Sequence, residues 1–159
     1  MSLLPVFKWI EATGVAVVIN NSKYAFALLE SVHILALAVI GGAVLIVDLR
    51  LFGVGFKNQP VASVATTARP WLIGSLIVIL ATGLLMFSSL AASKYYYNEA
   101  WWYKMYFLLA AVLFTFAVRQ PYALRESTRV PSVTAKVVAV VSIFLWLAVA
   151  VMGRAIGFI

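Results

Sequence analysis

Four long apolar runs, separated by shorter polar connections, dominate the pattern of hydrophobic and polar positions along the chain. Each run has enough consecutive apolar residues to cross a bilayer as a single helix, which needs about 20. Short connections make neighbouring spans antiparallel, so the pattern predicts an all-α integral membrane protein, an up-down four-helix bundle. The spans are expected over about residues 24–52, 70–90, 100–118 and 133–157.

Local signals mark where several of these spans should begin and end. Residues 20–22, Asn-Asn-Ser, are a plausible capping region before the first span, and Gly53 is typical of a helix stop. Pro70 is a favourable first-turn residue for the second span, and Pro121 is expected to end the third.

Two short segments outside the spans are also expected to be helical. In the stretch from about residue 4 to residue 12, Leu3, Phe7 and Ile10 can share one face, which predicts a short N-terminal interfacial helix lying on the membrane. Residues 60–65 could form a short surface helix in the first connection.

Composition agrees with a membrane-integral chain and excludes several kinds of chemistry. Of the 159 residues, 65% are hydrophobic and only 11% are charged, whereas soluble domains carry about 25% charged residues. We therefore expect one transmembrane domain over residues 1–159. The absence of cysteine excludes disulfides, thiolate metal sites and cysteine nucleophiles. The net charge of +7 is better explained by topology and anionic lipid headgroups than by nucleic acid, which we do not expect as a partner.

The distribution of basic residues gives an orientation. Seven lie in or beside the connections between spans one and two and between spans three and four: Arg50, Lys57, Arg69, Arg119, Arg125, Arg129 and Lys136. Five lie toward the opposite side: Lys8, Lys23, Lys94, Lys104 and Arg154. The positive-inside rule then predicts a multi-pass protein of the bacterial inner membrane with both termini in the periplasm.

The first span carries the only histidine of the chain on a polar stripe. Glu30, His33 and Asp48 fall on one narrow helical face. Ionisable side chains within a membrane helix are expected to face the bundle interior, a partner or water. Asp48 could pair with Arg69 or Arg119 at the inner surface.

Depth along the spans brings several polar residues to one level in the outer leaflet. At 1.5 Å per residue, His33, Met86, Lys104 and Arg154 lie at similar depth, with Glu30 one turn above His33. One interpretation is a shared cofactor pocket formed by all five residues. An imidazole and a thioether together form a haem-iron ligand set, with His33 as the iron ligand and Met86 as its partner, and the two cations would pair with the propionates.

Each of these residues also has a purely structural explanation. His33 could be a hydrogen-bonding contact between helices, and Met86 could simply fill space in the core. Lys104 and Arg154 could extend toward lipid phosphates, as basic residues near helix ends commonly do.

Several short motifs resemble a family of small, uncharacterised bacterial four-helix membrane proteins. The resemblance extends over nearly the whole chain from the first span onward, and it implies the four-helix fold without implying an activity. The motifs are His33-Ile34-Leu35-Ala36, Gly41-Gly42-Ala43-Val44, residues 47–53, Arg69-Pro70-Trp71, residues 82–87, Tyr96-Tyr97-Asn98, Lys104-Met105 and Gly153-Arg154-Ala155-Ile156.

A more distant resemblance is to HemJ-type membrane protoporphyrinogen oxidases and to CopD-type copper-resistance domains. The shared features are His33 in the first span, the run Arg50-Leu51-Phe52 at its end, and Trp101 followed three residues later by Lys104. The HemJ resemblance implies b-type haem. The chain departs from that pattern at Leu49 and Phe116, and without a second histidine one chain cannot supply bis-histidine ligation.

The leading hypothesis is an inner-membrane protein with an outer-leaflet pocket for haem b or a quinone-like ligand, in a redox or tetrapyrrole-related role. As an enzyme it would be a membrane oxidoreductase. The alternative is a non-catalytic subunit or assembly factor of a larger membrane complex, in which the polar stripe of the first span is a helix–helix interface, for example of a homo-oligomer. A third class is a small-solute or copper transporter. Membrane lipids are expected partners in every case.

Overall fold

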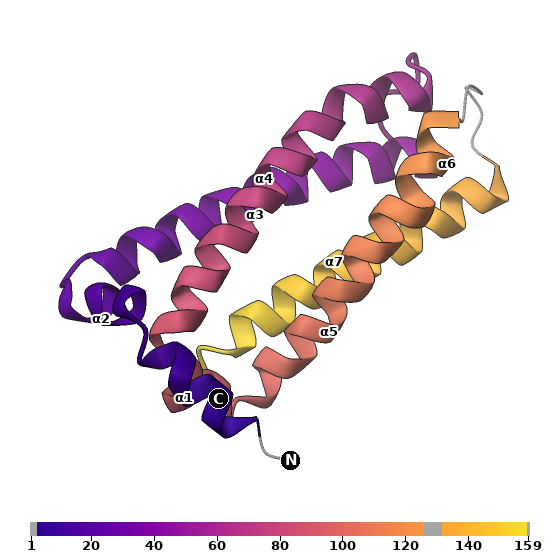
Figure 1. Cartoon of the computed structure of the whole chain (residues 1–159). Coiled ribbons are helices and arrows are strands. Elements are labelled where there is room, and N and C mark those ends of the chain that lie inside the picture. Colours follow the sequence, from indigo (N-terminus) through magenta and orange to yellow (C-terminus); the bar gives the residue numbers. More distant parts are fainter. Residues whose placement is uncertain (1–2, 126–131, 159) are drawn as a thin grey trace.

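The chain is helical throughout the part that the structure, a computed structural model, describes: residues 3–125 and 132–158, which contain no strand (Figure 1). In chain order the elements are α1 (Leu4–Glu11), α2 (Gly14–Asn21), α3 (Ala25–Phe52), α4 (Val61–Ser89), the π-helical turn η1 (Ala91–Tyr95), α5 (Glu99–Phe114), the π-helical turn η2 (Thr115–Arg119), α6 (Gln120–Arg125) and α7 (Val133–Ala155).

Four stretches of helix are long and apolar enough to cross a membrane. They are Ala25–Phe52, Val61–Ser89, Glu99–Arg125 and Val133–Ala155, of 28, 29, 27 and 23 residues. At 1.5 Å per residue even the shortest extends for about 35 Å, which exceeds the roughly 30 Å of the hydrocarbon core. The predicted all-α bundle is confirmed, and the chain is a multi-pass membrane protein. A short N-terminal helix, α1, precedes the spans.

Two of the predicted end signals act as expected on α3. The hydroxyl of Ser22 accepts a hydrogen bond from the Ala25 backbone N–H at 3.3 Å, which satisfies a free donor of the first turn. At the other end Gly53 adopts φ 93° and its N–H bonds to the carbonyl of Leu49. Glycine is suited to this left-handed cap because it has no Cβ.

The prediction that Pro70 begins the second span is wrong, because α4 begins nine residues earlier and Pro70 lies inside it. Residues 61–65 are therefore the first turns of α4 rather than a separate surface helix. Proline removes one backbone hydrogen bond of the helix, but tertiary packing outweighs that local loss. The side chains of Val61, Val64, Ala65 and Ala68 are buried in a core cluster with residues of α3, α6 and α7.

The prediction that Pro121 ends the third span is also wrong, since helix continues from α5 through η2 and α6 to Arg125. The turn before the proline is π-helical, and the N–H of Gln120 bonds to the carbonyl of Thr115. A π-helical turn is wider than an α-helical one. We attribute the continuation to this turn, which accommodates the proline ring where it would otherwise meet the preceding carbonyl.

The four spans form two antiparallel pairs that diverge from one end of the molecule to the other. Figure 1 shows α3 along α4 and α5 along α7. The pairs pack together at the end that carries the turn between α3 and α4, here called the loop end, through a core shared by α3, α4, α6 and α7. They diverge toward the terminal end, which carries α1, α2 and both chain ends, and there Phe87 of α4 stacks on Trp101 of α5.

Candidate functional site

His33 is held in one orientation by the α3–α4 pair. Its side chain is 8% exposed, and its Nδ1 lies 2.8 Å from the hydroxyl oxygen of Thr82. That hydroxyl donates its single proton to the Val78 carbonyl at 2.7 Å, so it accepts from the imidazole. The network thus assigns the proton of the neutral ring to Nδ1. Nε2 carries the lone pair and has no hydrogen bond to any described residue.

Gly83 lets α4 approach the imidazole closely. A Cβ at this position would lie 3.3 Å from Cε1 of His33 and 3.9 Å from its Nδ1. The first distance is tighter than an ordinary van der Waals contact, so a larger side chain at Gly83 would push the ring from its position beside Thr82. The glycine and the threonine together fix the direction in which Nε2 points.

Lys104 is held in a comparable way by the α5–α7 pair. Its half-buried side chain crosses Gly153, where a Cβ would lie 3.5 Å from Cε and 3.7 Å from Nζ. The ammonium makes no ion pair or hydrogen bond with any described residue. Its positive charge is within electrostatic range of the His33 imidazole.

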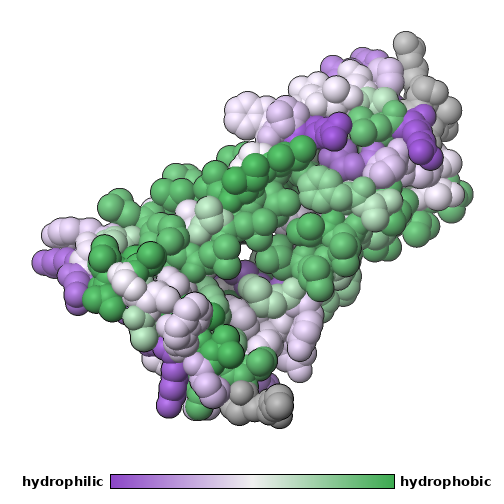
Figure 2. Space-filling view, in the orientation of Figure 1, coloured by the Kyte–Doolittle hydropathy of each residue, from purple (hydrophilic) through white to green (hydrophobic). Residues whose placement is uncertain are grey.

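The hollow between the helix pairs is visible on the molecular surface. Figure 2 shows it toward the terminal end, between the α3–α4 pair and the α5–α7 pair, with hydrophobic walls and hydrophilic atoms deep inside. In a membrane, a hollow between two helix pairs would be lined by side chains and would face lipid at its opening. The arrangement suits a ligand with an apolar body and a polar head.

Three other residues predicted for the pocket lie in different surroundings. Glu30 is exposed, and its negative charge, after burial, is the second cause that raises the pKa of Tyr95. Arg154 is exposed, with its guanidinium carbon 4.4 Å from the ring centre of Phe158, so its contacts are with the C-terminal turn. Met86 is half-buried. Of the five predicted residues, His33 and Lys104 are within electrostatic range of one another.

An aromatic cluster closes the terminal end next to these two residues. Phe87, one turn after Gly83, stacks on Trp101 with ring centres 5.0 Å apart, and Trp101 lies one turn before Lys104. Phe7 of α1 inserts edge-on against both rings, at 5.3 and 5.8 Å. These aromatic side chains partly face inward, since Tyr95 is buried and Trp101 is half-buried.

Helix α1 is fastened over this end by a carboxylate that the sequence pattern did not reveal. The Glu11 side chain accepts hydrogen bonds from the backbone N–H groups of Ala92 and Ser93, at 2.6 and 2.9 Å. These donors belong to η1, where the chain leaves the α4 helix. The contact positions Phe7 over the aromatic cluster.

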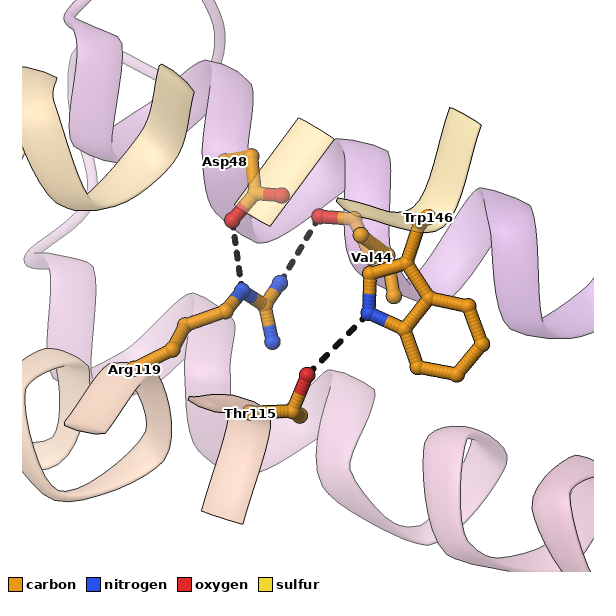
Figure 3. Close-up of polar contacts among 5 residues, drawn as sticks. All are labelled: Val44, Asp48, Thr115, Arg119 and Trp146. Carbon is orange, nitrogen blue, oxygen red and sulfur yellow. Dashed lines mark hydrogen bonds and ion pairs between the residues drawn. The ribbon is translucent and has the colours of Figure 1, made fainter. Parts of the chain in front are cut away.

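A second polar site, shown in Figure 3, lies near the loop end. Asp48 and Arg119 are fully buried and form the one ion pair among the described residues, with Nε 2.5 Å from Oδ1. Arg119 also donates to the Val44 carbonyl at 2.8 Å, and one turn earlier Thr115 accepts from the indole N–H of Trp146 at 3.1 Å. The expected pairing of Asp48 is thus with Arg119.

The π-helical turn η2 creates this second site and was not predicted. Both Thr115 and Arg119 lie in η2, so one distorted turn contacts α3 through the arginine and α7 through the threonine. Two sequence signals could have indicated this turn: Arg119, which lies close before Pro121, and Thr115, which lies four residues before Arg119.

The fold defines a multi-pass α-helical membrane protein. Residues 6–159 match DUF6644, a family of unknown function, and the chain belongs to that family. No curated protein and no solved structure matches the chain. The resemblance to HemJ-type oxidases and CopD-type domains therefore remains a hypothesis from sequence motifs.

Proposed function

We propose that the protein binds a quinone-like redox ligand in the hollow at the terminal end, with His33 and Lys104 contacting its polar head. One observation carries the proposal: a neutral imidazole nitrogen and an ammonium, neither with a hydrogen bond or counter-charge among the described residues, are within electrostatic range of one another. Both groups are incompletely satisfied within the described chain, and a ligand head that accepts from one and donates to the other would satisfy them.

The two residues offer opposite hydrogen-bonding roles to such a head. The Lys104 ammonium donates to a carbonyl oxygen, and Nε2 of His33 accepts from a hydroxyl and can hold the proton that leaves it. A quinone presents the carbonyl and its reduced form presents the hydroxyl. The apolar tail would extend between the helix pairs toward lipid, and the aromatic cluster of Phe7, Phe87 and Trp101 would cover the outer side.

Haem b is the second candidate, favoured by the orientation of the imidazole. A histidine that donates from Nδ1 to a neighbouring oxygen leaves Nε2 free as a metal ligand, as is usual at metal sites. Met86 would be the same-chain partner on the other side of the iron, and Lys104 would pair with a propionate. The stacking of Arg154 on Phe158 leaves the second propionate without its predicted partner, which is why we rank haem below a quinone.

The test is ligand binding by detergent-purified protein. We would titrate decyl-ubiquinone and its reduced form, decyl-ubiquinol, and follow quenching of tryptophan fluorescence, to which Trp101 and Trp102 at the site contribute. Replacing Lys104 by Met should weaken binding of the quinone about 10- to 100-fold, because a hydrogen bond to a charged group contributes about 1.5–3 kcal/mol. Replacing His33 by Gln should weaken binding of the quinol about 2- to 10-fold, because a neutral hydrogen bond contributes about 0.5–1.5 kcal/mol. Lys94→Met is the matched control, since Lys94 is an exposed lysine at the same end of the molecule.

Absorption spectra of the same preparations separate the two candidates. Protein expressed with supplied haem should show a Soret band that His33→Ala abolishes if haem is the ligand, and colourless protein excludes it. Equal quinone affinity in wild type and Lys104→Met, together with equal quinol affinity in wild type and His33→Gln, would overturn the quinone proposal.

We also propose that the protein resides in the bacterial inner membrane with both termini in the periplasm. The support is the distribution of basic residues, of which seven of the twelve lie in or beside the two connections at the loop end. Alkaline phosphatase fused to either terminus should be active, and fluorescent protein fused there should be dark. The reverse pattern would refute the orientation.

A further inference from the structure

A groove between α1 and the turn η1 lies at the terminal end of the molecule and opens to its surface. Its volume is about 460 Å³. It is separate from the hollow that contains His33 and Lys104, because neither residue lines it. Its lining combines charged and aromatic side chains with short apolar ones: Lys8, Glu11, Tyr97, Leu4, Ala12 and Ala92.

The groove lies at the depth expected of lipid headgroups. It is formed after the second span ends at Ser89 and before the third begins at Glu99. These spans of 29 and 27 residues extend for about 40 Å, beyond the roughly 30 Å of the hydrocarbon core. Helix α1 also presents apolar side chains outward, since Val6 is 52% exposed and Trp9 is 71% exposed. An amphipathic helix with an exposed tryptophan is typical of the membrane interface, so we expect headgroups to reach the groove.

Two opposite charges line the groove without neutralising one another. Lys8 and Glu11 are three residues apart on α1, a spacing at which side chains are neighbours, yet they form no ion pair. Glu11 uses Oε2 for both of its hydrogen bonds to the backbone of η1, and its Oε1 has no hydrogen bond with any described residue. The ammonium of the exposed Lys8 likewise has no partner among the described residues. A cation and a carboxylate oxygen are therefore both available in one groove.

We propose that this groove binds the headgroup of phosphatidylethanolamine from the surrounding leaflet. Lys8 would pair with the phosphate, and Oε1 of Glu11 would accept a hydrogen bond from the primary ammonium. The short apolar side chains of Leu4 and Ala12 would lie against the carbon atoms of the headgroup. The site does not depend on the ligand proposed for the hollow at His33, because the two share no residue.

Charge complementarity favours this lipid over other phospholipids. Phosphatidylglycerol supplies a phosphate for Lys8 but no cation for Glu11, and its negative charge would lie beside the carboxylate. The quaternary ammonium of phosphatidylcholine has no N–H to donate to Oε1. Quaternary ammonium groups are recognised by cages of several aromatic rings, whereas Tyr97 is the single aromatic residue in this lining. A headgroup with a phosphate and a primary ammonium therefore fits the groove best.

The experiment is native mass spectrometry of the detergent-purified protein, titrated separately with the three phospholipids carrying identical acyl chains. Wild type should bind phosphatidylethanolamine about 3- to 10-fold more tightly than the other two, since these charged contacts are only partly shielded from water. Glu11→Gln removes the charge but keeps a carbonyl oxygen for the N–H groups of η1, and it should lose this preference. Lys8→Gln should weaken binding of all three lipids, which share the phosphate. Glu99→Gln and Lys23→Gln are the matched controls, because both residues are exposed at the same end.

Several results would overturn the proposal. One is equal affinity of wild type for the three lipids, and another is tighter binding of phosphatidylglycerol, which would identify a basic surface without headgroup selection. A preference that persists in Glu11→Gln with wild-type circular dichroism would remove the role of the carboxylate. If Glu11→Gln does not fold, unchanged lipid affinity in Lys8→Gln is sufficient to reject the site. Glycerophosphoethanolamine, which lacks acyl chains, should bind far more weakly than the lipid; equal affinity would identify a site for a soluble ligand instead.

Discussion

Breaking the ion pair of Asp48 and Arg119 should destabilise the protein strongly, whereas replacing both partners together should not. Neither side chain is exposed, and the described partners of Arg119 are only the carboxylate and the Val44 carbonyl. Asp48→Val leaves a buried guanidinium with one hydrogen bond, and Arg119→Met leaves a buried carboxylate with none from a cation. Losing one member of a buried pair costs about 3–5 kcal/mol, a factor of more than about 100 in the folding equilibrium.

The double variant Asp48→Val/Arg119→Met should recover to within about 1 kcal/mol of wild type, because a buried pair is often energetically equivalent to apolar side chains that fill the same space. Unfolding by dodecyl sulfate in mixed micelles, followed by circular dichroism and by fluorescence, measures the three variants as a double-mutant cycle. Arg69→Met is the control, since Arg69 is exposed on α4 and was the other predicted partner of Asp48; it should change stability by less than about 0.5 kcal/mol.

Single variants that each lose less than about 1 kcal/mol, or a double variant as unstable as the sum of the two, would refute this reasoning. The first result would mean that the pair is hydrated or separated in the folded protein. The second would mean that each residue has its own partner. Either result would also mean that the contact of Asp48 with Arg119 does not hold the two helix pairs together at the loop end.

Two further predictions concern the terminal end. Gly83→Val should weaken quinol binding to the extent that His33→Gln does, because its Cβ would start 3.3 Å from the imidazole. Gly74→Val, on the same helix at a position where no atom lies within 4 Å, should bind the quinol normally, and equal effects of the two variants would refute the positioning role. Burial and then the charge of Glu30 raise the pKa of Tyr95 above 10.0, so ultraviolet titration should show a late-ionising tyrosine that is missing in Tyr95→Phe and titrates earlier in Glu30→Gln. The folded state holds the Tyr95 proton more tightly than the unfolded state, so the stability that protonated Tyr95 contributes should be lost as pH rises above 10.0. A wild-type titration in which every tyrosine ionises near pH 10.0 would contradict the raised pKa of Tyr95.

The fold could be predicted because length and hydrophobicity nearly determine it in a membrane. Four apolar runs allow few arrangements other than four antiparallel helices. The ends of the helices were less predictable, as Pro70 and Pro121 illustrate. Each is a local signal against continued helix, and at each the helix continues, at Pro70 because Val61 and Ala65 gain more from burial than one lost hydrogen bond costs. The sequence of α2 has no hydrophobic periodicity strong enough to predict a helix there.

The candidate site was only partly predictable. The position of a residue along a helix gives its depth in the membrane but not the direction in which its side chain points. Counting residues from helix centres predicted that His33 and Lys104 lie at similar depth, and in the structure the two are within electrostatic range of one another. The same counting placed Arg154 at the site, but its guanidinium packs on Phe158, a contact made possible by the turn that follows α7. Glu30 shares a stripe with His33 and yet is exposed, because it lies near the start of α3, where the helix pairs have separated.

The geometry of the candidate site depends on how the two helix pairs meet rather than on any one helix. His33 is fixed within the α3–α4 pair by Thr82 and Gly83, and Lys104 is fixed within the α5–α7 pair by Gly153. Neither contact connects the pairs, so the distance between imidazole and ammonium follows from the angle at which the pairs diverge. That angle is constrained at the loop end, where Arg119 of η2 bonds to α3 and Thr115 of the same turn bonds to α7. It is also constrained at the terminal end, where Phe87 of α4 stacks on Trp101 of α5. The proposed ligand site lies between these two contacts, so we expect a variant that breaks either of them to change the distance between imidazole and ammonium.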